Sequence, residues 1–173
     1  SSRLQEPVAI PSAKQAPVNR PVLDLLDCPD KENLHLAGRL DRSSSGLILL
    51  TNGGRWSESL TDTERKIRKH YLVETDRPIP AEAVKKFEDG FEFQPEGIRT
   101  RPATLVIHGP CHAGVTLEEG RYHQIKRMFH RLDGIRLVSL HRDRIGSIAL
   151  PHDLAAGDWR PLTAAEIQSP HPS

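Results

Sequence analysis

The sequence predicts an α+β fold with a largely antiparallel mixed β-sheet and flanking helices. Segments with the two-residue period of strands outnumber helical segments, and the two kinds do not alternate strictly, as they would in a parallel α/β fold. No internal repeat with a period of about 20 to 50 residues occurs. A length of 173 residues suits one domain or two half-sized lobes.

Before residue 80, turn residues separate short apolar runs. Asn19 and Pro21 precede a leucine-rich stretch, 22–26, that fits a short helix or a buried extended turn equally well. Farther on, apolar and polar residues alternate around Tyr71 and Val73, as in a half-buried strand. The predicted strands are 34–37, 47–51 and 69–75, and a further short helix is predicted at 56–60.

After residue 80 the helical signals are stronger. A helix is predicted at 81–89, because Gly90 ends it and Val84 and Phe87 lie three residues apart. The clearest helix, 122–132, is closed by Gly134. A capping box of Thr163 and Glu166 begins a final short helix. The predicted strands here are 103–108, 114–117, 136–140 and 145–150.

Composition excludes several classes of protein. The longest apolar runs are far shorter than the roughly 18 to 20 residues of a membrane span, and no charged-then-apolar leader opens the chain, so no membrane partner is expected. Cys28 and Cys111 are the 2 cysteines and have no metal-ligand spacing. The sequence therefore predicts no disulfide framework and no zinc site, and a reducing cytoplasm as the location.

The helix 122–132 has one apolar stripe and one basic face. Between Arg121 and Arg144 there are seven Lys and Arg residues against two acids, whereas the whole chain has a net charge of only +1. Such a local excess of cations indicates a polyanion partner, and the abundance of Arg and His favours RNA. The alternative is a helix face that is merely solvated.

Two further residues suit chemistry on RNA. Asp41 lies in a polar turn between Arg39 and Arg42, where it either bonds turn amides or serves as an ionised carboxylate beside a fixed cation. Tyr71 lies in a predicted strand, where it either packs in the core or offers a ring on which a base stacks.

Three ordered segments of the sequence carry motifs. They are Gly38-Arg39-Leu40-Asp41 through Gly54, then Lys69-x-Tyr71-Leu72-Val73, and Glu119-Gly120-Arg121-Tyr122-His123-Gln124-Ile125-Lys126-Arg127-Met128. These segments resemble the signature motifs of the RsuA-type ribosomal RNA pseudouridine synthases. The closing segment 159–163 also resembles the end of this family, so the resemblance extends from about residue 6 to 167. Tyr122 and His123 in the third motif are closer to members that act on small-subunit (16S) rRNA.

The resemblance implies roles for individual residues. Asp41 matches the catalytic aspartate, Tyr71 the uracil-stacking tyrosine, and Lys126 the basic residue paired with the aspartate. The implied reaction isomerises a uridine within RNA to pseudouridine and needs no cofactor, which agrees with the lack of a phosphate-binding Gly loop or a metal motif. The residues expected to bind RNA are Arg39, Arg42, Lys69, Arg121, His123, Gln124, Arg127 and Arg131.

The expected organisation is a linker or tail at 1–15, a pseudouridine synthase catalytic domain at 16–168 with two half-lobes around a central cleft, and a tail at 169–173. The expected partner is rRNA in an assembling small-subunit particle, bound by a monomer. Glu6 and Ala9 depart from the family pattern, and the small N-terminal S4-type domain of relatives has no room before Glu6. Either that domain was trimmed, or binding relies on the basic helix. These departures keep open the alternative of a non-catalytic RNA-binding or assembly module.

Overall fold

The computed structural model describes residues 8–12, 33–38, 40–41, 43–121, 123–155 and 158–168, with the backbone alone at 8–12, 61 and 63. The predicted helix at 22–26 lies outside the described residues. A mixed sheet forms the centre of the molecule, with the strand order β11-β1-β3-β9-β4-β8-β7, and with β2 beside β3 and β10 beside β9. The pairing of β3 with β9 is parallel, and the other pairings among these strands are antiparallel.

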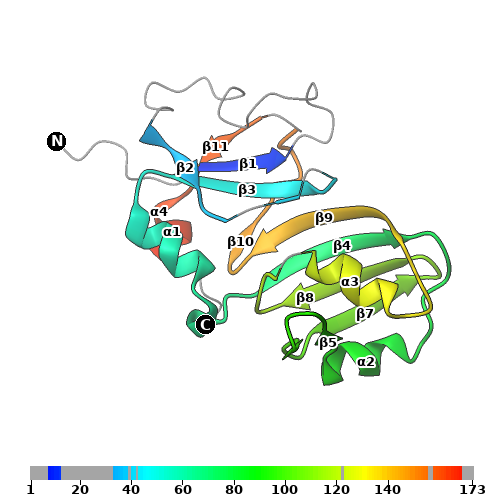
Figure 1. Cartoon of the computed structure of the whole chain (residues 1–173). Helices are drawn as coiled ribbons and strands as arrows, with labels where there is room; N and C mark the ends of the chain where they lie inside the picture. The colour runs from blue at the N-terminus through cyan, green and yellow to red at the C-terminus, as the bar shows by residue number, and fades with distance from the viewer. Residues whose placement is uncertain are drawn as a thin grey trace.

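The strands divide into two groups in Figure 1. The upper group contains β1 (Val8–Ser12), β2 (His35–Leu36), β3 (Ser45–Thr51) and β11 (Arg160–Pro161). The lower group contains β4 (Lys69–Thr75), β7 (Thr104–Gly109), β8 (His112–Leu117) and β9 (Leu137–Ile145), and β10 (Ile148–Ala149) follows β9. A separate hairpin pairs β5 (Glu92–Phe93) with β6 (Ile98–Arg99). Strand β1 falls within the stretch expected to be a linker.

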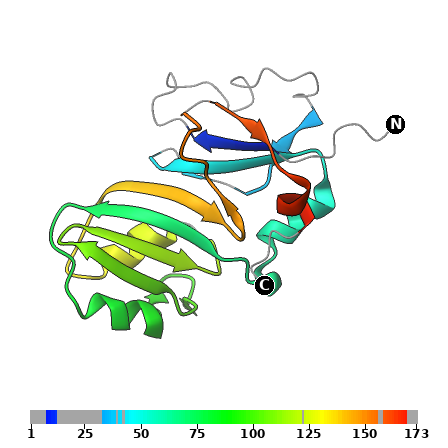
Figure 2. The ribbon, with the colours of Figure 1, turned by 180° about the vertical axis from the view of Figure 1, so that it is seen from behind.

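The helices are short. In Figure 1, α2 (Ala83–Asp89) and α3 (Gln124–His130) lie in front of the lower strands, and α1 (Gly54–Thr61) and α4 (Ala164–Gln168) lie beside the upper strands. A 3₁₀ turn, Thr63–Arg65, precedes β4. Seen from behind in Figure 2, β9, β4, β8 and β7 lie in front of α3, and no described helix covers that face of these strands.

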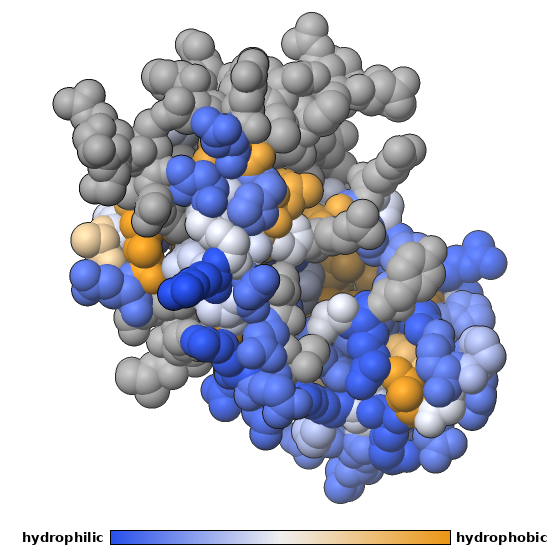
Figure 3. Space-filling model, turned by 60° about the vertical axis from the view of Figure 1, so that its left-hand side comes forward, coloured by the Kyte–Doolittle hydropathy of each residue, from blue (hydrophilic) through white to orange (hydrophobic). Residues whose placement is uncertain are grey.

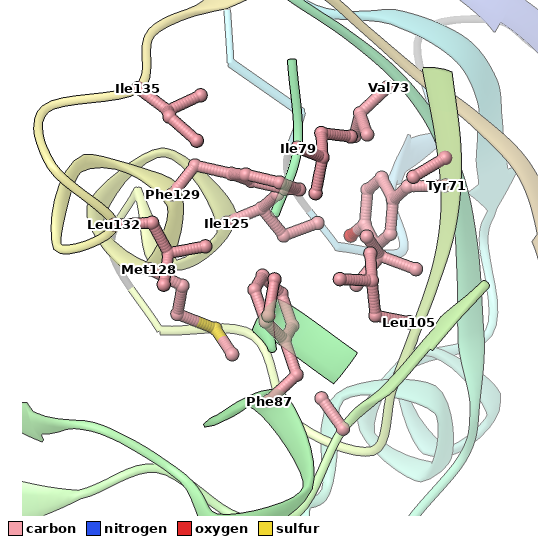
Figure 4. Close-up of a cluster of buried hydrophobic side chains, with 14 of the residues drawn as sticks. Tyr71, Val73, Ile79, Phe87, Leu105, Ile125, Met128, Phe129, Leu132 and Ile135 are labelled. Carbon is pink, nitrogen blue, oxygen red and sulfur yellow. The ribbon is translucent and has the colours of Figure 1, made fainter. Parts of the chain in front are cut away.

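Two hydrophobic clusters match the two groups of strands. On β4, Tyr71 and Val73 are buried while Leu72 between them is exposed, as alternation predicts. The larger cluster lies between this face of the lower sheet and helices α2 and α3, and Figure 4 shows its centre. The smaller cluster includes Leu47, Leu60 and Leu162 and holds the upper strands against α1.

The two groups of strands join where β3 pairs with β9. Gly46 pairs with Arg142 and has a φ of +115°. A Cβ at this position would lie 2.1 Å from the carbonyl oxygen of Arg142, so only glycine allows the two backbones to approach this closely. This junction brings the loop before β3, which carries Asp41, next to the lower sheet.

The predicted elements agree with the structure in several places. β4 has the predicted bounds, α2 and α3 begin two residues later than predicted, and the capping box of Thr163 and Glu166 is formed by both reciprocal hydrogen bonds. The predicted break at 141–144 is wrong, because β9 runs through it. The buried Arg142 guanidinium donates from Nε and Nη2 to the carbonyl of Leu47, so the strand continues through charged residues.

Candidate active site

The loop between β2 and β3 holds Asp41 near the surface. The carbonyl of Asp41 accepts a hydrogen bond from the amide of Ser44 at 2.9 Å, which closes a turn and leaves the carboxylate about 36% exposed. Ser44 is buried and its hydroxyl has no hydrogen-bond partner. This hydroxyl lines the same cavity as Asp41 and could hydrogen-bond to a molecule bound there.

A cavity of about 360 Å³ brings the three predicted catalytic residues together. Asp41 reaches it from the loop before β3, Tyr71 from β4 and Lys126 from the first turn of α3. Ser44 and Gly120 also line it. Segments distant in sequence thus meet at one opening between the upper and lower strands.

His123 is the basic residue in contact with the carboxylate. Its Nε2 lies 3.4 Å from Oδ2 of Asp41, and its backbone has a left-handed φ of 48° at the start of α3. The Nζ of Lys126 lies 2.6 Å from the hydroxyl of Ser43. The resemblance predicts that Lys126 pairs with the Asp41 carboxylate. Within the described residues, Lys126 instead contacts Ser43 of the same loop, and no ion pair with Asp41 is formed. The His123 imidazole, which follows a left-handed backbone turn, is therefore nearer to the Asp41 carboxylate than the Lys126 ammonium is.

Tyr71 belongs both to the core and to the cavity. Its side chain is buried, and its ring points from β4 toward Ile125 of α3 within the larger hydrophobic cluster (Figure 4). It also lines two cavities, and its hydroxyl makes no hydrogen bond within the described residues. Both interpretations of this tyrosine thus remain compatible with its position.

Replacing Tyr71 separates the two roles. If Tyr71 stacks on the uracil, Tyr71→Ala should lower the single-turnover rate of uridine isomerisation about 10- to 100-fold, since stacking on an aromatic ring stabilises a base by about 1 to 3 kcal/mol. Tyr71→Phe keeps the ring, so its rate should fall several-fold at most. Val73→Ala, on the same buried face, controls for loss of packing. Equal, small effects of both Tyr71 variants would leave core packing as its only role.

Two cations lie beside Tyr71. Lys69, on the same face of β4, is half-buried, and burial followed by the charge of Arg142 lowers the pKa of its ammonium below its usual value. Arg142, opposite Tyr71 on β9, is 3% exposed. Sequence reasoning missed Arg142 because it lay in a segment predicted to be a loop. Residues 141–144 are all polar or charged, so the sequence carries no periodic signal that continues the strand through Arg142.

A buried carboxylate holds the loop that presents His123. Glu119 is 3% exposed and accepts hydrogen bonds from the Arg101 amide at 2.7 Å, from Gln124 Nε2 at 2.8 Å and from Arg121 Nε at 3.0 Å. Gln124 Oε1 in turn accepts from the Arg121 amide at 3.0 Å. Gln124 and Arg121, which were predicted to bind RNA, thus take part in the hydrogen bonds that hold this loop. No pattern in the sequence indicated that Glu119 accepts these hydrogen bonds.

The basic face of α3 lines a larger cavity of about 550 Å³. Arg131 lies on this face, whereas Arg127 also bonds Glu96 Oε2 at 2.7 Å and lies 3.9 Å above the Phe93 ring. The hydrogen bond from Arg127 lowers the pKa of Glu96. Arg39 and Arg42 lie outside the described residues. The lining side chains that can carry positive charge are His123, Lys126, Arg127, His130, Arg131 and Arg136.

The described part of the chain has few features outside this region that suggest chemistry. It contains no cluster of three His, Cys, Asp or Glu residues able to hold a metal ion. None of its helices is long and apolar enough to cross a membrane. Hydrophilic residues cover most of the described surface in the view of Figure 3, with small hydrophobic patches between them.

Similar proteins agree on one family. The model of the RNA pseudouridylate synthase family matches residues 7–131. A ribosomal small subunit pseudouridine synthase A from Pseudomonas aeruginosa is 45% identical over 166 residues, which are 96% of this chain and 72% of that protein. The protein of the same name from Escherichia coli (strain K12) is 41% identical, with 96% and 71% covered.

A solved structure supports the same assignment. A crystal structure of a pseudouridylate synthase superposes with a TM-score of 0.89 at 33% identity, covering 95% of this chain and 73% of the other. The mixed sheet, the loop before β3 and the cavity between the two groups of strands therefore belong to a known enzyme fold. The chain is a member of the RNA pseudouridylate synthase family, whose enzymes are isomerases.

Proposed function

We propose that this chain isomerises a uridine of small-subunit ribosomal RNA to pseudouridine, with Asp41 as the catalytic carboxylate. The observation that carries the proposal is that Asp41, Tyr71 and Lys126 line the same cavity. The names of the relatives support ribosomal RNA as the substrate. An assembling small-subunit particle in the cytoplasm is the proposed setting, and the chain is proposed to act as a monomer.

The chemistry requires one carboxylate and a way to hold the base. Asp41 acts as the nucleophile toward C1′ of the ribose while the bond from C1′ to N1 breaks and its electron pair stays with the uracil. The uracil turns, C5 forms a bond to C1′ as the bond from C1′ to Asp41 breaks, the proton on C5 passes to water, and N1 takes up a proton from water. Tyr71 holds the base during the turn, and His123 keeps a basic group beside the carboxylate.

The target nucleotide has to leave its stack to reach Asp41. Flipping costs a few kcal/mol, which stacking on Tyr71 and phosphate contacts along the basic face of α3 offset. His123 and Lys126 line both the cavity of the basic face and the cavity of Asp41, so the two cavities are adjacent. An RNA strand bound along the basic face would thus pass the cavity that holds Asp41.

Tritium release tests the proposal directly. Small-subunit rRNA fragments labelled at C5 of uridine are incubated with the chain, and release to water is followed with time. Release by the parent chain supports the proposal. No release, with RNA binding intact, would instead favour a non-catalytic RNA-binding or assembly module that keeps the synthase fold.

Arg131 is expected to contribute to affinity rather than to rate. Its guanidinium lines the cavity of the basic face and lies 5.6 Å from the Phe93 ring centroid. Arg131→Met should weaken binding of all RNA sequences similarly and lower the salt slope by about one unit, since each lost phosphate contact releases about 0.7 to 0.9 fewer counterions. Filter binding at several salt concentrations measures this, with Arg99→Met on β6 as control. Sequence-dependent loss with an unchanged slope would contradict it.

A further inference from the structure

A second cavity adjoins that of Asp41. It has a volume of about 280 Å³ and shares Tyr71 and Gly120 with the first cavity as a common wall. Lys69 and Arg142 also line it. A Cβ on Gly120 would lie 3.4 Å from Nζ of Lys69, so the ammonium stands against this shared wall.

Among the described residues, the Lys69 ammonium has no counterion. Within the described residues it makes no hydrogen bond, and no carboxylate lies within 4.0 Å of it. The acids that line the same cavity each pair with an arginine of their own. These pairs are Asp62 with Arg65 at 3.8 Å, Glu118 with Arg68 at 3.5 Å, and Glu119 with Arg121 at 3.0 Å.

We propose that Lys69 stabilises the negative charge that develops on the uracil when its bond to C1′ breaks. This role rests on the proposed function, because the electron pair of that bond passes to the base and is withdrawn again only when C5 bonds to C1′. An ammonium that is half-buried in a cavity lowers the energy of a neighbouring anion more than one in open water does. Lys69 is next but one to Tyr71 on the same face of β4, beside the ring on which the base stacks.

The walls of the cavity favour a base over a phosphate group. Ala37, Leu60, Ile67 and Ile145 make part of its lining apolar. Such apolar walls suit the faces of a planar base, which enters neutral and becomes anionic only during the reaction, better than a phosphate group, which is always charged.

Matched lysine variants test the role. We expect Lys69→Met to lower the single-turnover rate of tritium release about 100-fold at saturating RNA, comparable to the loss of one oxyanion donor, with RNA affinity within a few fold of the parent. Lys69→Arg retains the charge and should recover most of the rate. Lys86→Met on the exposed side of α2 is the control.

Two further readouts distinguish charge stabilisation from a structural role. The rate of the parent should fall as the pH rises through the lowered pKa of Lys69, and this limb should vanish in Lys69→Arg, since arginine stays protonated. The thermal midpoint of Lys69→Met should equal or exceed that of the parent, because a half-buried cation without a partner among the described residues destabilises the folded state. The other charged or titratable groups facing this cavity are Asp62, Tyr71, Glu118, Glu119 and Arg142.

The outcomes are separable. The role of Lys69 would be overturned if Lys69→Met released tritium at the parental rate. It would also be overturned if the variant lost RNA affinity and salt slope but kept its rate. In both cases, tritium release by the parent would still support the proposed function. A pH limb that persists in Lys69→Arg would overturn the role of Lys69 as well. Absence of release by the parent itself would overturn the proposed function, and the role of Lys69 with it.

Discussion

Replacing Asp41 by asparagine is expected to lower the rate of isomerisation by about 10³-fold or more, while RNA affinity stays within a few fold. The amide keeps the size of the carboxylate but loses the charge and the nucleophilic oxygen, and removing a nucleophile costs orders of magnitude in rate. The side chain is half-exposed, so few packing contacts change. Affinity should remain because, in the proposed binding mode, the phosphate contacts come from the basic face of α3 and not from Asp41.

Single-turnover tritium release with the parent, Asp41→Asn and Asp89→Asn measures this effect. Asp89 is an exposed aspartate at the end of α2 and serves as the matched control. RNA binding and thermal unfolding are measured on the same samples, so that a folding defect is recognised. Parental turnover by Asp41→Asn would show that another group performs the chemistry.

Local patterns predicted the elements that carry the site. Strand β4 follows from the alternation around Tyr71 and Val73, and α3 from an apolar stripe ended by Gly134. Both signals are short-range, because the side chains on one face of an element must all be buried together. Asp41 was placed in a turn because polar and turn-forming residues surround it, and the structure has it in the loop before β3.

Contacts between distant segments were not predictable in this way. The continuity of β9 depends on the Arg142 guanidinium, which finds its acceptor, the carbonyl of Leu47, 95 residues away in the chain. Which basic side chain of α3 lies against Asp41 depends on the left-handed backbone of His123. Neither a pairing across 95 residues nor a single backbone angle leaves a periodic signal in the sequence.

Glu119 illustrates how a residue without such a signal can control the site. Its carboxylate joins three segments: Arg101 before β7, Arg121 in the loop after β8, and Gln124 at the start of α3. The same loop contains Gly120 in the wall of both cavities and leads to His123 at the carboxylate of Asp41. A change in Glu119 should therefore alter stability and geometry together.

We expect Glu119→Ala to lower the free energy of unfolding by about 2 to 5 kcal/mol, because two buried donors, the Arg101 amide and the Gln124 amide group, lose their acceptor. Denaturant unfolding measures this loss. Glu118→Ala is the matched control, since the neighbouring side chain pairs at 3.5 Å with the exposed Arg68 and should lose less than about 1 kcal/mol.

Glu119→Gln separates the hydrogen bonds from the charge. The amide oxygen can still accept from the Arg101 amide and from Gln124, but the amide nitrogen would face Arg121 Nε, itself a donor. Stability should therefore fall less than in Glu119→Ala, while the Arg121 end of the loop is released. If this contact positions His123 and Gly120, the single-turnover rate of Glu119→Gln should fall about tenfold or more, since a displacement of about 1 Å can cost up to 100-fold in rate. Parental rates in a variant of reduced stability would limit Glu119 to a structural role.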